Sequence, residues 1–324
     1  MIIKRKEGWG DVRYDLVNHD FSYNYINDFV RPNPYLSQPV LLNIDLTFRC
    51  NMKCIHCVAK DMEEMLVNRY GNSDLVISDR LINDINESPF IAIVITGGEP
   101  LLPEYENQIV KLLEKIKNKA IIIDTNGTIS PSIKLINLLK SKKAMLRVSW
   151  DIPVPSDECQ LRKYPDDLYK NPQHYMESKE KLIKYFLKNQ ITTGIQTVIH
   201  GQNFRNRNMY SFPKKLKSMG INKWYLQRFI PSYRAKTDTK FIIPIKEYEE
   251  AVKKIKKAAQ ESDVTCTTKK DRRHNSVFLL VRDGDIYTQS DEIAGQKIFI
   301  GRINNIKDWF RYVSSSDHSV RYCL

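Results

Sequence analysis

The feature that most constrains the fold is a regular alternation of short apolar runs with amphipathic segments between residues 41 and 230. The runs are rich in β-branched residues, as in FIAIVIT at Phe90–Thr96 and AIIIDT at Ala120–Thr125. Continuous apolar runs of this length are typical of strands that are buried on both faces. Between them, apolar residues recur at helical spacing, for example over residues 104–118. The alternation predicts a parallel sheet whose strands are joined by helices.

Six strand-then-helix steps follow one another in this part of the chain. The predicted strands are Leu41–Thr47, Phe90–Thr96, Ala120–Thr125, Leu146–Trp150, Thr193–His200 and Trp224–Phe229. Helices are expected from about Ser78 and over residues 104–118, 133–139, 176–189 and 212–219, and residues 152–175 are expected to form a long polar loop. Six such units predict an α/β fold with a partial (β/α)6, TIM-like parallel barrel. Functional groups are then expected at the carboxyl ends of the strands.

The segments on either side of the barrel differ from it in character. Residues 1–40 are aromatic-rich and are expected to be an irregular N-terminal extension, which leads into the barrel at residues 41–231. Residues 232–324 are expected to form a small α+β appendage. Its predicted elements are a helix over Glu247–Gln260, a hairpin of Val277–Arg282 and Asp285–Thr288, a strand at Ile298–Gly301 and a short helix at Ile306–Tyr312.

Composition limits the class of protein. Hydrophobic residues make up 42% of the 324 residues and charged residues 27%, which rules out a disordered chain. No apolar run approaches the roughly 18 residues that a membrane span needs, and the N-terminus lacks the apolar core of a secretory signal. We therefore expect a soluble, cytoplasmic protein without a membrane partner. The formal net charge of +13 would suit phosphates, acidic peptides or nucleic acid, but its lysines are spread over polar helix faces.

Three of the six cysteines lie close together, in Cys50-Asn-Met-Lys-Cys54-Ile-His-Cys57, directly after the first predicted strand. A structural zinc site normally needs four protein ligands, and His56 inside the motif cannot easily be the fourth. An iron–sulfur cluster tolerates three protein ligands if its fourth iron binds something else. The C-x3-C-x2-C spacing therefore favours a cluster with one open site.

Four motifs, in this order, resemble those of the radical S-adenosylmethionine (SAM) enzymes. The cysteine motif is followed by Thr96-Gly97-Gly98-Glu99-Pro100, Thr125-Asn126-Gly127 and Ser149-Trp150-Asp151, each at the end of a predicted strand. The resemblance covers about residues 41–230. It implies one [4Fe–4S] cluster held by Cys50, Cys54 and Cys57, with SAM as the ligand of the fourth iron.

The resemblance also implies a set of SAM-binding residues. They are His56, Gly97, Gly98, Glu99, Asn126, Ser149, Asp151, Gln196 and Val198. In the family the Gly-Gly segment holds the methionine amine of SAM, and Glu99 supplies negative charge beside it. His56 occupies the position of an aromatic residue that packs on adenine in many members. An imidazole can stack as well, although His56 could instead only cap the loop.

The resemblance implies an enzyme that cleaves SAM reductively and abstracts a hydrogen atom from a substrate, with an electron donor such as flavodoxin or ferredoxin. The segment after residue 277 resembles the SPASM or twitch half-domain of peptide-modifying members, but it has no cysteine between Val277 and Tyr322 for an auxiliary cluster. It also resembles viperin-like enzymes, which act on nucleotides. A ribosomal peptide is the favoured substrate, and a nucleotide or another small molecule is the alternative.

Two other classes remain open at this point. One is a non-catalytic iron–sulfur scaffold or electron carrier, which would not need the Gly-Gly-Glu and Ser-x-Asp motifs. The other is a zinc-bearing nucleic-acid binder, which would be colourless; a nucleic-acid partner is not expected for the enzyme. Cys159, Cys266 and Cys323 are candidate hydrogen donors to a substrate radical, or else ordinary core or surface cysteines.

Overall fold

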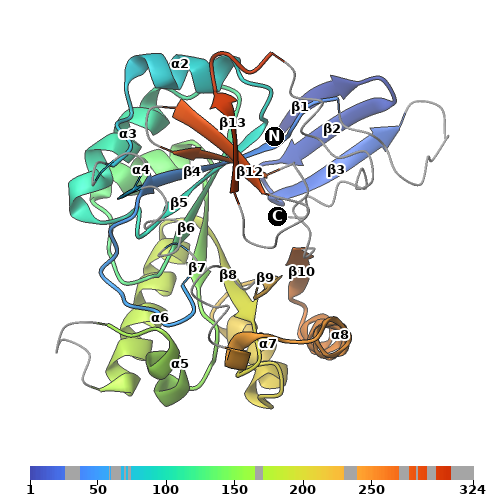
Figure 1. Ribbon diagram of the computed structural model, residues 1–324. Helices are drawn as coiled ribbons and strands as arrows, with labels where there is room; N and C mark the ends of the chain where they lie inside the picture. The colour runs from blue at the N-terminus through green and yellow to red at the C-terminus, as the bar shows by residue number, and fades with distance from the viewer. Residues whose placement is uncertain are drawn as a thin grey trace.

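The computed structural model describes residues 1–25, 37–57, 59, 67–68, 71, 74–164, 171–229, 239–269, 277–281, 284–289 and 297–307. These parts contain a three-stranded antiparallel sheet and a ten-stranded, mostly parallel sheet (Figure 1). Among the helices described there, none combines the length and the apolar character needed to cross a bilayer.

The six predicted barrel strands lie side by side, parallel and in chain order, in the large sheet. They are β4 (Leu41–Thr47), β5 (Ala92–Gly97), β6 (Ala120–Thr125), β7 (Met145–Ser149), β8 (Thr192–Ile199) and β9 (Lys223–Arg228). Two of them have the predicted bounds, and the other four begin or end one or two residues away. The predicted α/β partial barrel is therefore confirmed, and the carboxyl ends of its strands meet at one edge.

Helices cover one face of this sheet (Figure 1). They are α2 (Asp79–Glu87), α3 (Glu106–Lys115), α4 (Ile133–Ser141), α5 (Pro155–Leu161), α6 (Pro172–Lys188), α7 (Asn208–Ser218) and α8 (Ile245–Glu261), with short 3-10 turns η1 (Pro103–Tyr105) and η3 (Thr239–Phe241). Serine hydroxyls cap two of them, because Ser78 accepts from the Leu81 amide and Ser132 from the Leu135 amide. The apolar sides of the helices pack on residues such as Leu42 and Ile44 to form the main core.

The expectation that the first 40 residues are irregular is wrong for residues 2–25. They form strands β1 (Ile2–Glu7), β2 (Gly10–Asp15) and β3 (Asp20–Tyr25), which pair antiparallel. Val12 and Tyr14 are fully buried against Leu41, Met145 and other residues near the starts of the barrel strands. This small sheet therefore covers the amino end of the barrel interior and leaves the carboxyl ends of the strands for the site.

The expected long loop at residues 152–175 is also wrong in part, because it contains α5 and the start of α6. Both helices begin with proline, at Pro155 and Pro172. Proline is well tolerated at the first helical position, because the amide hydrogen that it lacks would have no partner there. Two of the four prolines in this segment, Pro155 and Pro172, are therefore helix starts. Residues 165–170 lie outside the described part.

Strands from beyond residue 232 extend both edges of the barrel sheet. On one edge, β10 (Thr265–Lys269) pairs parallel with β9 after the predicted helix α8. On the other edge, β11 (Val277–Val281) pairs parallel with β4, and β12 (Asp285–Gln289) and β13 (Lys297–Arg302) follow antiparallel. The predicted hairpin and its third strand are thus present in one sheet with the barrel. The division into residues 1–40, 41–231 and 232–324 stays a prediction, and the helix expected at residues 306–312 lies mostly outside the described residues.

Candidate active site

The cysteine loop starts directly after β4 and places its three thiols in different surroundings. Cys50 is exposed, Cys54 is buried and Cys57 is half-buried. The Cys50 Sγ accepts from the Met52 amide at 3.3 Å, and the side-chain nitrogen of Asn126 lies 3.8 Å from it. Burial raises the pKa of the Cys54 thiol to about 12, so iron bound there would have to displace its proton.

The metal-binding side chains near the cysteine loop are not grouped like the ligands of a single metal ion. Within the described residues, no three His, Cys, Asp or Glu side chains surround one ion position. A tetrahedral zinc ion would hold its thiolates about 3.8 Å apart, given Zn–S bonds of about 2.3 Å. In a four-iron cluster each thiolate binds a different iron, so the sulfur atoms stand further apart. Cys50, Cys54 and Cys57 could each bind a different iron of such a cluster.

Gly97 and Gly98 bring the end of β5 into direct contact with the start of the cysteine loop. The Gly98 amide donates to the Thr47 carbonyl at 2.6 Å, and a Cβ added to Gly98 would lie 2.0 Å from the Arg49 carbonyl oxygen. A Cβ on Gly97 would lie 2.2 Å from the Thr47 carbonyl oxygen, and Gly97 has a φ of +123°. Glycine is required here by this close backbone approach. The contact of these glycines with SAM stays a prediction.

Glu99 joins the ends of two strands. Its side chain is 0% exposed and accepts three hydrogen bonds, from the Leu101 amide at 3.1 Å, the Thr125 hydroxyl at 2.8 Å and the Asn126 amide at 2.7 Å. The Asn126 side chain in turn donates to Asn51 Oδ1 at 2.8 Å, within the cysteine loop. Burial raises the pKa of Glu99 to about 7, although the three donors favour the ionised form. Its expected role beside the SAM amine stays a prediction.

The pKa of Glu99 predicts a pH dependence of stability. Because the folded-state pKa of about 7 lies above the ordinary value of 4.5, this group contributes stability that is complete below about pH 4.5 and is lost as the pH rises through 7. The difference between these two pKa values corresponds to about 3 kcal/mol of free energy. Relative to the Glu99→Gln variant, the wild type should therefore lose up to about 3 kcal/mol of unfolding free energy between pH 4.5 and 8.

Urea unfolding of the metal-free proteins at both pH values measures this difference. Glu104→Gln is the matched control, because Glu104 is an exposed carboxylate in the neighbouring turn η1. If the wild type and the Glu99→Gln variant lose stability in parallel as the pH rises, Glu99 does not hold its proton in the folded state.

Asp151 lies two residues beyond the end of β7 and is enclosed by protein donors. Its Oδ1 accepts from the Val198 amide at 2.7 Å, and its Oδ2 accepts from Arg162 Nε at 2.8 Å and lies 3.0 Å from His56 Nε2. Burial alone would raise the pKa of Asp151, but the Arg162 guanidinium and the His56 ring hold it well below its usual range. Asp151 thus joins the β7 end to β8 and to the cysteine loop. Its predicted contact with SAM is not tested by these contacts.

Sequence reasoning missed three charged residues that complete this network, namely Glu158, Arg162 and Lys179. Glu158 is 0% exposed, and its carboxylate accepts from the amides of Asp151 and Ile152 at 3.1 and 2.8 Å. It also forms ion pairs with Lys179 at 3.0 Å and with Arg162 at 3.5 Å. The i, i+4 spacing of Glu158 and Arg162 after Pro155 was the available signal for a helix here.

The other predicted residues near β7 and β8 are half-buried at the same strand ends. Ser149 is the last residue of β7, and its carbonyl accepts from Lys179 Nζ at 3.1 Å. Gln196 and Val198 lie on β8, where the Gln196 carbonyl accepts from the Trp150 amide at 3.0 Å. The structure therefore brings all nine predicted SAM-binding residues to the carboxyl edge of β4 to β8 or the loops that follow, while their contact with SAM stays a prediction.

His56 lies in a group of rings above the strand ends. Its ring centroid is 5.7 Å from that of His200 and 6.1 Å from that of Phe241. His200 Nδ1 accepts from the Gln202 amide at 3.1 Å, and burial lowers the pKa of His200 to about 3, so its ring is neutral with the proton on Nε2. Within the described residues, His56 Nδ1 and His200 Nε2 are buried without a hydrogen-bond partner. These two orphaned nitrogens mark a place where a polar ligand group would be stabilised.

The structure describes two of the three isolated cysteines, and these two lie in different parts of the fold. Cys159, on α5, packs in one apolar cluster with Met52, Cys54 and Tyr175. Cys266, on β10, packs against the main core, and burial raises its pKa to about 12. Cys323 lies outside the described residues. Among the described candidates for a hydrogen donor, Cys159 is the one beside the cysteine loop.

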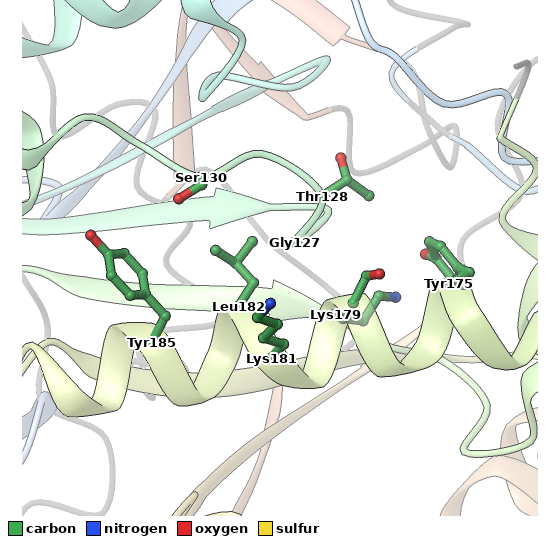
Figure 2. Close-up of a pocket in the computed structure, with 9 residues that line it drawn as sticks. Gly127, Thr128, Ser130, Tyr175, Lys179, Lys181, Leu182 and Tyr185 are labelled. Atoms are coloured by element: carbon green, nitrogen blue, oxygen red, sulfur yellow. The ribbon is translucent and has the colours of Figure 1, made fainter. Parts of the chain in front are cut away.

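A pocket of about 320 Å³ is lined by the loop after β6 and by α6. Figure 2 shows the loop after β6, with Gly127, Thr128 and Ser130, facing side chains of α6 that include Tyr175 and Tyr185. The Thr128 hydroxyl accepts from Asn51 Nδ2 at 2.9 Å, which connects the pocket wall to the cysteine loop. None of the predicted SAM-binding residues lines this pocket.

The fold and the cysteine loop together define an iron–sulfur enzyme class built on a partial parallel barrel. A family model described as the Radical SAM superfamily matches residues 44–212, which is more than half of the chain. The chain therefore belongs to the radical SAM superfamily. It is an enzyme that uses a [4Fe–4S] cluster and SAM.

Individual relatives match shorter parts of the chain. The GTP 3′,8-cyclase of Clostridium perfringens is 33% identical over 90 residues, which are 26% of this chain and 27% of that protein. The antilisterial bacteriocin subtilosin biosynthesis protein AlbA of Bacillus subtilis is 29% identical over 106 residues, which are 32% of this chain and 22% of that protein. The chain thus matches about a quarter of the length of these relatives.

A solved structure extends the similarity over nearly the whole chain. SuiB of Streptococcus suis, bound to SAM, superimposes with a TM-score of 0.65 over 99% of this chain and 89% of SuiB, at 13% sequence identity. At this identity the similarity concerns the fold.

Proposed function

We propose that this protein is a radical SAM enzyme that modifies a ribosomally made peptide. The observation that carries the proposal is the extent of the similarity to SuiB, which reaches beyond the barrel into the N-terminal and C-terminal strands. SuiB is also known bound to its precursor peptide SuiA, in a form that matches 88% of this chain with a TM-score of 0.57. AlbA, whose segment is 29% identical, is a bacteriocin biosynthesis protein. Both support a peptide substrate.

In this proposal Cys50, Cys54 and Cys57 hold the cluster. When bound, the cluster and SAM supply one-electron cleavage of the sulfonium and abstraction of a hydrogen atom from the substrate. The chain's own residues hold the site together. Glu99 fastens the ends of β5 and β6. Asp151 fastens the end of β7 to the cysteine loop through His56 and to the end of α5 through Arg162. The electron donor of flavodoxin or ferredoxin type and the cytoplasmic location remain predictions.

A nucleotide substrate is the second candidate function. The segment that is 33% identical to a GTP 3′,8-cyclase supports it, and so does the formal net charge of +13, which favours a phosphate-bearing ligand. The cyclase segment covers only 27% of that protein, whereas the fold similarity to SuiB covers 99% of this chain. We therefore rank the peptide first.

The test uses protein reconstituted anaerobically with iron and sulfide and reduced with dithionite. We expect 5′-deoxyadenosine to form from SAM, and its rate to rise several-fold with a peptide encoded beside this protein's own gene but not with GTP. A peptide made with deuterated amino acids should pass deuterium into the 5′-deoxyadenosine. Stimulation and deuterium transfer from GTP alone would reverse the ranking, and no 5′-deoxyadenosine under any condition would contradict the proposed activity.

A further inference from the structure

The cysteine loop has an inner and an outer side. Along residues 52–56 the side chains alternate, so that Met52, Cys54 and His56 are buried while Lys53 and Ile55 are exposed. Residues 52–54 have no regular secondary structure, and Ile55 and His56 form a turn in which the Cys57 amide donates to the Cys54 carbonyl at 3.4 Å. The inner side carries Cys54, a proposed cluster ligand, and the outer side faces solvent.

Two backbone hydrogen bonds fasten this segment to the end of α5. The Lys53 amide donates to the Lys163 carbonyl at 2.7 Å, and the Ile55 amide donates to the Leu161 carbonyl at 3.0 Å. The partners run in opposite directions, so Lys163 lies opposite Lys53, and Arg162 lies opposite Cys54. In agreement, Arg162 Nη1 lies 4.0 Å from the Cys54 sulfur. The pairing brings two lysines that are far apart in sequence together outside the proposed cluster site.

We call Lys53, Ile55 and Lys163 the loop patch. Both lysines are exposed, and no carboxylate among the described residues forms an ion pair with either of them. Ile55 is 43% exposed, although large apolar side chains are mostly buried in this protein. Two neighbouring positive charges, without a counter-charge among the described residues and beside an exposed apolar side chain, form a surface that a partner with carboxylates would stabilise.

The position of the loop patch indicates what kind of partner it fits. Lys53 and Ile55 lie on the outer side of the same short segment that carries Cys54 and ends at Cys57, and Lys163 lies beside them. The rate of electron transfer between redox centres falls steeply with the distance between them. A carrier that docks on the loop patch would therefore have a short path to the cluster, through the loop itself.

We propose that the loop patch is the docking surface for a small acidic electron-transfer protein of flavodoxin or ferredoxin type. This inference rests on the proposed function, because it requires the cluster at Cys50, Cys54 and Cys57. One electron passes from the reduced carrier to the oxidised cluster, so the carrier is oxidised and the cluster is reduced by one electron, with no proton or leaving group. Carboxylates of the carrier meet Lys53 and Lys163, and its apolar surface covers Ile55. Opposite charges of this kind mainly accelerate association and make it sensitive to salt.

The test compares two double variants of the reconstituted enzyme. Lys53→Glu/Lys163→Glu reverses the charge of the loop patch. Lys253→Glu/Lys257→Glu is the matched control, because these lysines are exposed on α8, which packs against α7 and β10, and the change in net charge is the same. Stopped-flow absorbance near 400 nm follows reduction of the cluster by reduced flavodoxin or by dithionite, at low and high salt, after the iron content has been matched.

With flavodoxin at low salt, the loop-patch variant should be reduced on the order of 10-fold more slowly than the wild type, and high salt should narrow the difference. The control variant should behave like the wild type, and dithionite should reduce all three proteins at similar rates. Equal flavodoxin rates for the two variants would overturn the docking surface. So would slower reduction of the loop-patch variant by both reductants, because the lysines would then act on the cluster itself.

Two further outcomes distinguish a failure of the proposed function from a failure of the docking proposal alone. If the wild type takes up no cluster, the proposed function fails, and the docking surface fails with it. If the loop-patch variant keeps the wild-type flavodoxin rate but loses turnover of the substrate with dithionite, the patch binds substrate and the docking proposal is wrong.

Discussion

Replacing Cys54 by serine is expected to leave a folded protein that holds no intact four-iron cluster and forms no 5′-deoxyadenosine from SAM. Thiolates bind iron strongly, and serine offers only a hydroxyl, which stays protonated near neutral pH. Cys54 is buried, so water cannot easily take its place as a ligand. The loss should exceed the roughly 10–100-fold effects typical of residues that only support a metal ligand. Iron and sulfide content and absorbance near 400 nm measure it.

Two other cysteine variants control this experiment. Cys266→Ser changes a thiol of β10 that packs in the main core, and it should keep full iron content. Cys159→Ser changes the thiol that packs beside Cys54, so it tests whether a fourth cysteine belongs to the ligand set. Full iron content in the Cys54→Ser variant, or its loss in Cys159→Ser, would show that the proposed ligand set of Cys50, Cys54 and Cys57 is incorrect.

Replacing Arg162 by methionine should destabilise the metal-free protein by about 3–5 kcal/mol, the usual loss when one partner of a buried ion pair is removed. Arg162 pairs with Asp151 at 2.7 Å and with Glu158 at 3.5 Å, and both carboxylates are 0% exposed. Without the guanidinium, the Asp151 carboxylate would keep the Val198 amide and His56 as its partners among the described residues. Urea unfolding followed by circular dichroism gives the change in the free energy of unfolding.

An exposed ion pair provides the comparison. Arg205 pairs with Glu247 at 2.6 Å on the surface, so Arg205→Met should cost at most about 1 kcal/mol. The double variant Asp151→Asn/Arg162→Met should recover part of the loss, because it removes the uncompensated charge together with its partner. An Arg162→Met variant as stable as Arg205→Met would mean that the buried network does not hold this part of the site together.

The sequence predicted the barrel well because its strands are buried on both faces. A run such as AIIIDT at Ala120–Thr125 is apolar at successive positions, and few alternatives to a central parallel strand suit it. Parallel strands end at the same edge, so the cysteine loop, the Gly-Gly-Glu segment and Ser149 were expected at one site, and the structure brings them to one edge. The prediction needed only local composition and the direction of the strands.

The parts that the sequence missed depend on contacts over long distances in the chain. Strand β2 has few apolar residues, and Val12 and Tyr14 are buried only because residues such as Met145 and Tyr225 lie against them. Similarly, nothing near Asp151 in the sequence shows that Arg162 returns to it, because that contact depends on how α5 packs beside the cysteine loop. Patterns over a few residues carry no information about such partners.

The amino-acid sequence alone determined the parallel strands, their order and the set of polar residues that stand at their ends, since these follow from burial and from chain direction. Only the tertiary structure decided which of those residues hold the protein together. Glu99 and Asp151 are surrounded by protein donors, and Lys53 and Lys163 meet on the outside of the loop. The physical reason is that hydrogen bonds and ion pairs form between side chains whose distance is set by packing, and packing is a property of the whole fold.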